Sequence, residues 1–405
     1  MAPSSLEAES HPPVATEATG APRTLSRLEL LPSELIVEIM KKMRPTELTR
    51  LAKSSKRLLA VFQKSIGITL PFVLQRQPEL EIILLLCTAS RRELQRDRML
   101  HPRAITFDPK ASDNGFSPDA NKDIVLLEPS IVGDPEFRHI RVNMGFMTHV
   151  WNVLKFVDWW ADEYPAIRWR DQPEDRRCLR SDEEARVRKA IARWWLYAHY
   201  FHMNNHRDVY QPKKWADDKR LHHIRLMSTR EICELETLWN AVYDLISHEL
   251  CSSVQEIDAA NGGGVDRVRW GKDEGRHRAI VSTYMKLDPS MIKGFIYEFY
   301  GRKKMDIVYA TRTLKKDFNL DSESMSSAMT TVLQERMMLK PNGISSPPRS
   351  GIVDEDRDED VDPNVWDKDD APNGKPPLDP QRIRSFPWEN QKRLPYGDDG
   401  SEEPR

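Results

Sequence analysis

Five histidines near the middle of the chain have types and spacings that could hold a metal. His199, His202 and His206 recur at intervals of three and four, so an α-helix would place them on one face. His222 and His223 follow them, and imidazole is a common zinc ligand. No HExxH motif accompanies them, however, and the segment around them is rich in tryptophan and tyrosine. The sequence therefore favours packing and surface roles, and we expect no metal and no cofactor.

Motifs of nucleotide-binding and hydrolytic enzymes are missing. The sequence contains no GxGxxG, GxxxxGK[ST] or GxSxG pattern. The glycine run at residues 262–264 lacks the strand and helix context of a phosphate-binding loop, and the pair Glu183–Glu184 is typical of charges at a helix N-terminus. A triad assembled in space would leave no such pattern. On these absences we expect no catalytic residues and no enzymatic activity.

A basic stretch with nearby aromatic residues keeps nucleic-acid binding as a weaker alternative. It comprises residues 302–304 and the segment from Arg312 to Lys316. Most runs of this kind are solvated faces of helices. The sequence accordingly gives more support to a protein partner than to nucleic acid.

Residues 28–64 have the pattern of two or three short amphipathic helices. Pro32 can occupy the first turn of a helix, where its missing N–H is not needed, and Glu34 follows near the positive end of the helix dipole. Arg44 and Pro45 mark the end of this helix and the start of the next. The apolar positions of the segment are Leu35, Ile39, Met43, Leu48, Leu51, Leu58 and Phe62.

A hairpin of this size buries too little surface to be stable alone. It must pack on the rest of the chain, on a partner, or on both. One interpretation is a docking module for another protein, and the other is the first hairpin of a single helical domain.

This segment resembles an F-box, the helical module that docks a protein onto a Skp-type adaptor and thereby onto a cullin ubiquitin ligase. It departs from the family pattern at Lys53 and Ser54, where apolar residues are usual, and at Leu58, which replaces a frequent tryptophan. The matching residues are Leu31-Pro32, Glu34-Leu35, Ile39, Pro45, Glu47-Leu48, Leu51, Ser55, Lys56-Arg57 and Leu58.

The resemblance implies a non-catalytic, substrate-recruiting subunit of a Skp–cullin–F-box ubiquitin ligase. Its partners would be the Skp-type adaptor with its cullin complex and an unknown target protein held by the helical region that follows. A helical interaction scaffold without ubiquitin transfer is the alternative. The remainder of the chain is similar to the tryptophan-rich helical regions of fungal F-box proteins. The adaptor-binding residues that the resemblance implies are Leu31, Pro32, Leu35, Ile39, Leu48, Leu51 and Leu58.

The rest of the chain up to residue 340 is expected to be mostly helical. Apolar spacing predicts a helical run from Phe72 to about Met99 and further helices from about Asn143 to Leu339. Residues 102–141 contain five prolines, so we expect a long loop with one short strand near residues 124–127. Two capping boxes are predicted, at Ser181 with Glu184 and at Ser228 with Glu231. Tryptophans that could build a recognition surface or, more often, a core are Trp159, Trp160, Trp194, Trp195, Trp215, Trp239 and Trp270.

Both ends of the chain are expected to be disordered. Of the 405 residues 31% are charged and 39% hydrophobic, with a net charge of −2. Residues 351–405 alone contain 16 acidic and 8 basic residues, and residues 1–24 are rich in proline and small polar residues. Such segments cannot build a core. We therefore predict an all-α protein with disorder at 1–24, an F-box hairpin at 25–65 packed on a larger irregular helical region at 66–340, and a disordered acidic tail at 341–405.

Composition also bears on the compartment. Four cysteines stand far apart without a CxxC pattern, which suits a reducing compartment. No secretory signal pattern is visible, and the longest strongly apolar run, Ile82–Cys87, is far shorter than the ~20 residues of a membrane span. We expect an intracellular protein of the cytoplasm, the nucleus or both, without a membrane contact.

Overall fold

The computed structural model confirms the helical fold class and describes a large part of the chain. The glycine run at 262–264, the basic stretch at 302–316, and residues 1–24 lie outside the described residues. The described residues are 26–95, 104–108, 124–127, 139–202, 218–251, 281–282, 284–298, 324–338 and 351–354.

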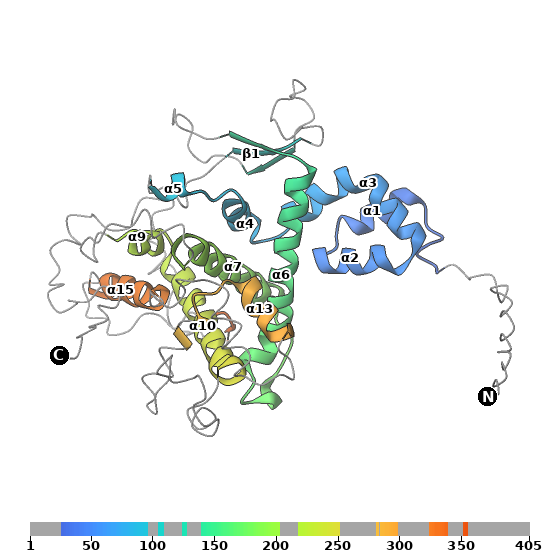
Figure 1. Cartoon of the computed structure of the whole chain (residues 1–405). Helices are drawn as coiled ribbons and strands as arrows, with labels where there is room; N and C mark the ends of the chain where they lie inside the picture. The colour runs from blue at the N-terminus through green and yellow to red at the C-terminus, as the bar shows by residue number, and fades with distance from the viewer. Residues whose placement is uncertain are drawn as a thin grey trace, which may run out of the picture.

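Three helices, α1, α2 and α3, form the N-terminal unit (Figure 1). Pro45 occupies the first turn of α2, and the Ser55 hydroxyl caps α3 by accepting a hydrogen bond from the N–H of Arg57. Both features follow from the residue types, since proline lacks the N–H that a first turn does not use. The bounds are α1 Ser33–Met40, α2 Pro45–Ser54 and α3 Lys56–Gln75.

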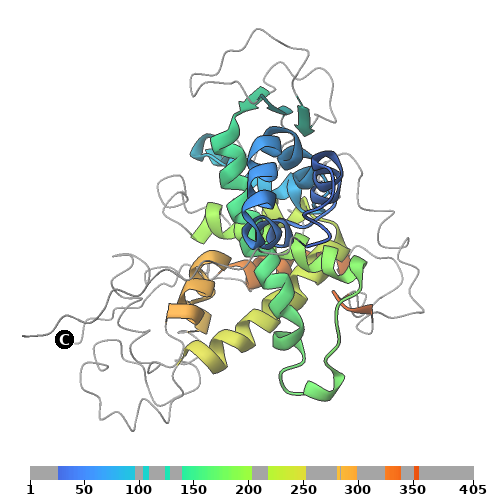
Figure 2. The same cartoon turned by 90° about the vertical axis from the view of Figure 1, so that its right-hand side faces the viewer.

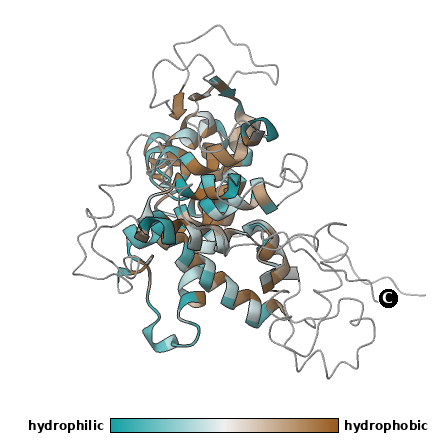
Figure 3. Ribbon diagram, turned by 90° about the vertical axis from the view of Figure 1, so that its left-hand side faces the viewer, coloured by the Kyte–Doolittle hydropathy of each residue, from teal (hydrophilic) through white to brown (hydrophobic). Residues whose placement is uncertain are grey.

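The remaining helices make up the body of the molecule. Helix α6 runs between the N-terminal unit and the other body helices (Figures 1 and 2). Hydrophobic and hydrophilic residues alternate along these helices (Figure 3), as in amphipathic helices that bury one face. The bounds are α4 Leu80–Cys87, α5 Arg91–Gln95, α6 Met144–Arg168, α7 Ser181–Tyr197, α9 Lys219–Arg225, α10 Thr229–Leu245, α13 Pro289–Glu298 and α15 Met325–Met338, with the 3-10 turn η2 Pro173–Asp175 and the π-helical extensions η3 Ala198–His202 and η5 Ile246–Leu250.

A small sheet occupies part of the segment that the sequence predicted to be a loop. Strand β1, Ala104–Phe107, lies between β2, Ile124–Leu127, and β3, His139–Val142. It pairs antiparallel with β2 and parallel with β3. The strand at 124–127 is confirmed, whereas the other two strands, β1 and β3, were missed. Strands of four residues are too short for a period of two to stand out.

Most of the described tryptophans pack in the core. Trp160 and Trp194 are fully buried, and their rings meet edge to face with centroids 5.4 Å apart. Trp239 continues the cluster, with its centroid 6.2 Å from that of Trp194. Trp159 and Trp195 are only partly buried, and Trp215 and Trp270 lie outside the described residues.

One of the two predicted capping boxes is confirmed. Ser228 accepts a hydrogen bond from the N–H of Glu231, and its own N–H donates to the Glu231 carboxylate. The box predicted at Ser181 is wrong by one residue, because α7 has Arg180 at its N-cap. The Arg180 N–H donates to Glu183 at 2.8 Å, and Glu184 makes contacts elsewhere.

Residues 351–354 differ from the tail predicted at 341–405. Ile352 and Val353 are buried against the body. The Asp354 carboxylate accepts hydrogen bonds from Arg180 at 2.8 Å and Arg186 at 2.7 Å. The acidic composition of the tail led to a prediction of disorder. It gave no indication that two apolar residues are buried here, or that a carboxylate faces two arginines on or next to α7.

Candidate protein-docking site

Exposed apolar side chains concentrate on the N-terminal unit. A folded protein usually spreads such residues singly, so a group of them indicates a surface that a partner covers. Leu30 is 64% exposed, Leu35 51% and Ile68 58%. The exposed large apolar residues in the described part of this unit are Leu30, Leu35, Ile39, Leu59, Ile68 and Phe72, against Val125, Tyr297 and Met338 in the described remainder.

Helix α1 presents its exposed residues along one stripe and packs on α3 by another. Leu35 and Ile39 are one turn apart and both exposed, while Ile36 and Met40 are fully buried against the core. The sequence predicted Leu35 and Ile39 as part of an apolar stripe without separating the two faces. The resolved arrangement gives α1 a core face and an uncovered apolar face.

The two ends of α1 are fixed to α3. At the start, Arg57 Nη2 donates a 3.0 Å hydrogen bond to the carbonyl of Leu31, directly before Pro32. At the other end, Lys41 Nζ lies 4.7 Å from the centroid of the Phe72 ring, a cation–π contact. The uncovered face of α1 is therefore held in place before any partner arrives.

The segment before α1 is fixed in the same way. The Ser55 hydroxyl donates a hydrogen bond to the carboxylate of Glu29, and the Glu29 carboxylate also accepts the N–H of Ser26. The hydrogen bond from Ser55, followed by that from Ser26, lowers the pKa of Glu29. The turn that leads into Leu31 and Pro32 is thus anchored to the start of α3.

The structure places the seven predicted adaptor-binding residues in three environments, and their roles remain predictions. Pro32, Leu35 and Ile39 are exposed. Leu31 and Leu51 are partly buried against the core. Leu48 and Leu58 are buried, so in this conformation their side chains hold the three helices together and do not reach the surface. Four exposed apolar residues of the unit, Leu30, Leu59, Ile68 and Phe72, are not among the predicted adaptor-binding residues. Three of them lie on α3, and the signal for these three is that α3 carries apolar residues on more than one face.

Helix α3 also passes a test of length and composition for a membrane span. It is 20 residues long, which is about the thickness of the hydrocarbon core. Helices in the cores of soluble proteins pass the same test, and α3 packs against α1, α2 and α6. These contacts account for the buried apolar residues of α3, whereas Leu59, Ile68 and Phe72 remain exposed.

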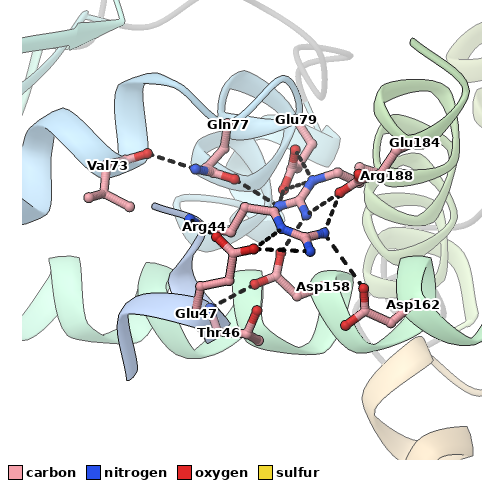
Figure 4. Close-up of polar contacts among 10 residues, drawn as sticks. All are labelled: Arg44, Thr46, Glu47, Val73, Gln77, Glu79, Asp158, Asp162, Glu184 and Arg188. Atoms are coloured by element: carbon pink, nitrogen blue, oxygen red, sulfur yellow. Dashed lines mark hydrogen bonds and ion pairs between the residues drawn. The ribbon is translucent and has the colours of Figure 1, made fainter. Parts of the chain in front are cut away.

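A buried polar joint connects the N-terminal unit to the body (Figure 4). Its centre is Arg188 on α7, which is 2% exposed and donates to the fully buried carboxylates of Glu79 and Asp158. Arg188 Nη2 also donates to Gln77 Oε1 at 2.8 Å, and Gln77 donates in turn to the carbonyl of Val73. Every hydrogen-bonding group of this buried cluster thereby gains a partner, as buried charges require.

Burial and charge act in opposite directions on this cluster. Burial raises the pKa of Glu79, and the positive charge of Arg188 partly counteracts it. Burial alone would lower the pKa of Arg188, but the charges of Glu79 and Asp158 outweigh it and raise that pKa. The arginine is therefore fixed in its charged form and needs its carboxylate partners.

The N-terminal unit enters the joint through the start of α2. The N–H of Thr46 donates to Asp158 Oδ2 at 3.0 Å, so the positive end of α2 faces a carboxylate of α6. Arg44 Nη1 donates to Glu184 Oε1 at 2.7 Å and lies 3.6 Å from Asp162 Oδ1. Burial raises the pKa of Asp162, and the nearby Arg44 opposes this shift. Charges on α2, α6 and α7 thus fix the docking face relative to the body.

The candidate metal ligands are not gathered into a site by the described residues. His199 and His202 lie on η3, and His206 lies outside the described part of the chain. Within that part, no three histidine, cysteine or acidic side chains are placed to hold a metal ion. His223 is fully buried among the rings of Tyr197 and Phe201, and burial lowers its pKa to about 3.

Comparison with protein families agrees with this geometry. Residues 28–66 match the family model of the F-box domain. The matched range covers α1, α2 and the first half of α3, together with the exposed stripe of α1. Neither a comparison with curated proteins nor one with solved structures finds a match for the chain.

Proposed function

Because this chain contains an F-box domain at residues 28–66, we propose that it is a substrate-recruiting adaptor subunit of a Skp–cullin–F-box ubiquitin ligase. In this role the F-box domain binds a Skp-type adaptor protein, and the helical region after it binds a target protein. The exposed apolar stripe on α1, inside the matched range, is the observation that carries the proposal.

The exposed apolar stripe of α1 can contribute to the free energy of binding a partner. Covering a leucine or isoleucine side chain contributes roughly 1.5–3 kcal/mol when it is fully buried. Leu35 is 51% and Ile39 36% exposed, so covering what remains of the two side chains contributes roughly 1–3 kcal/mol together, with Leu30 and Pro32 beside them at the start of the helix. These exposed residues make the direct contacts in our proposal, and the buried Leu48 and Leu58 support them from within.

The adaptor role itself is non-catalytic. Holding a target beside a ubiquitin-transferring complex raises the local concentration of that target, so the chemistry is carried out by other subunits. The four cysteines, Cys87, Cys178, Cys233 and Cys251, are all free thiols, in keeping with action in the cytoplasm or the nucleus. A scaffold that binds the adaptor without ubiquitin transfer is the alternative.

Co-purification of the full chain with a Skp-type adaptor tests the F-box assignment. We expect Leu35→Asp with Ile39→Asp to weaken the complex more than 100-fold, because two unpaired charges in an apolar interface cost several kcal/mol. Met338→Asp is the matched control, since Met338 is an exposed apolar residue of α15, outside the matched range. Undiminished co-purification of the double variant would show that α1 is not the docking helix.

Target binding is tested by proximity labelling in cells with the same pair of variants. Ligase components should disappear from the Leu35→Asp and Ile39→Asp double variant, whereas target proteins should remain. A point variant is better here than deletion of residues 28–64, because the deletion would uncover Asp158, which is fully buried at the joint. Loss of every labelled protein together would argue against a separate target-binding region. Ubiquitination of the target proteins by the unaltered chain's complex would favour the ligase, and its absence would favour the scaffold alternative.

A further inference from the structure

An aromatic cage on the surface of the body encloses a lysine. Lys293 Nζ lies 4.8 Å from the ring centroid of Phe156, 4.9 Å from that of Trp159 and 5.7 Å from that of Tyr297. Phe156 and Trp159 are neighbours on one face of α6, and Lys293 and Tyr297 are one turn apart on α13. All three distances are within the ~6 Å at which a ring face attracts a cation.

The walls of the cage are fixed from behind. Trp159 Nε1–H donates a 2.8 Å hydrogen bond to the hydroxyl of Tyr297, which links two walls. Trp159 also meets the buried Trp160 edge to face, with ring centroids 5.1 Å apart. The Trp160 indole in turn donates to the carbonyl of Pro289 at the start of α13. The rings are therefore positioned by the packing of α6 against α13.

The occupant of the cage is held weakly in comparison with a buried ion pair. Among the described residues, no carboxylate lies within ion-pair distance of Lys293. Burial lowers the pKa of Lys293, the neighbouring charge of Lys155 acts in the same direction, and the more distant carboxylate of Glu163 opposes both. Tyr297 is 59% exposed, so one wall of the cage is open to water and the flexible lysine side chain has a path out.

We propose that Phe156, Trp159 and Tyr297 form a binding site for a cationic side chain of a partner protein, a methylated lysine, and that Lys293 occupies this site until the partner displaces it. Rings without a carboxylate select a cation that needs few hydrogen bonds. A methylated ammonium has fewer N–H groups that need hydrogen-bond acceptors than an unmodified lysine. The N–H donors of an arginine guanidinium would find no acceptor among the rings. The proposal is independent of the F-box domain, since no residue of the cage belongs to it.

Titration of the full chain with trimethyllysine amide tests the site. The neutral analogue, in which a tert-butyl group replaces the trimethylammonium group, is the matched ligand, and tryptophan fluorescence with ligand-observed NMR is the readout. We expect Lys293→Ala to bind the charged ligand at least tenfold more tightly than the unaltered chain, because the resident competitor is gone. The neutral analogue should bind neither protein.

Two further variants make the result decisive. Adding Trp159→Ala to Lys293→Ala should abolish binding of the charged ligand. Tyr297→Leu in the same background should weaken it at least fivefold, and this exposed position tolerates substitution if Trp159→Ala does not fold. The proposal is overturned if Lys293→Ala binds the charged and neutral ligands equally, or neither of them, or if it binds the charged ligand no better than the unaltered chain.

Discussion

Oδ2 of Asp158 accepts a 3.0 Å hydrogen bond from the backbone N–H of Thr46. One of these residues belongs to α6 of the body and the other to α2 of the F-box domain. Asp158 also pairs with the buried Arg188 of α7. One carboxylate therefore contacts both the F-box domain and the helices of the body.

Replacing Asp158 should destabilise the whole protein. In Asp158→Ala the buried Arg188 loses one of its carboxylates and Thr46 loses its acceptor, and breaking a buried pair by removing one partner costs about 3–5 kcal/mol. Urea denaturation, followed by circular dichroism, measures the loss. Asp171→Ala is the control, because Asp171 forms an exposed ion pair with Arg170, and we expect its midpoint to be unchanged. Equal midpoints for both variants would contradict a structural role for the joint.

Replacing Arg188 should make stability depend on pH in a defined direction. Arg188→Met leaves the buried carboxylates of Glu79 and Asp158 without their cation, and burial raises the pKa of Glu79. A carboxyl whose folded pKa is raised binds more protons when folded, so its contribution to stability falls as pH rises above the unfolded value. The difference in unfolding free energy between the unaltered chain and Arg188→Met should therefore grow from pH 5 to pH 7.5. A difference that is constant over this range would count against the buried carboxylates as its cause.

His223 should make the protein less stable in acid. Its pKa is about 3 in the folded state against an ordinary value of 6.5, so the unfolded chain binds the proton first. Stability from this residue is complete above pH 6.5 and is lost as pH falls towards 3, by about 1.4 kcal/mol per pH unit. His223→Phe should flatten the pH dependence of unfolding between pH 6.5 and 4.5. Above pH 7.5 the slopes of the two proteins should agree, and parallel slopes at lower pH would rule out His223 as the acid-sensitive group.

The short segment at residues 351–354 should stabilise the body. Arg186 Nε donates to the carbonyl of Ile352 at 2.7 Å, and the Asp354 N–H donates to Glu183 at 3.0 Å. Burying the Ile352 side chain contributes roughly 1.5–3 kcal/mol. A chain that ends at residue 350 should unfold at lower urea concentration than one that ends at residue 354. If the two midpoints coincide, the segment is not bound to the body in solution.

The long helices were predictable from the sequence because their apolar periodicity runs over many turns. Helices α6, α7 and α10 each span 17 residues or more, so the stripe of buried positions is evident. Helix α1 has only eight residues, SELIVEIM, most of them apolar. In so short a helix the pattern cannot separate Leu35, which is exposed, from Ile36, which is buried. The sequence located the docking module, and packing decided which side chains face outward.

The polar joint and the cage were beyond sequence reasoning for a different reason. Arg188 is 109 residues from Glu79 in the chain, and Trp159 is 138 residues from Tyr297. No local spacing encodes such pairs, because they meet only after α6 has packed against its neighbours. Neither Phe156 with Trp159 on α6 nor Lys293 with Tyr297 on α13 was singled out from the sequence.

The hydrogen bonds of Thr46 and Arg44 have a mechanical consequence. A rotation of the F-box domain against the body would have to break both contacts together, and Asp158 would lose the donor that α2 supplies. In the proposed function, a target protein bound by the body helices is therefore presented to the ubiquitin-transferring complex in one fixed orientation. The contacts between the F-box domain and the body, and not the length of a flexible linker, then determine which face of the target lies near the ubiquitin-transferring complex.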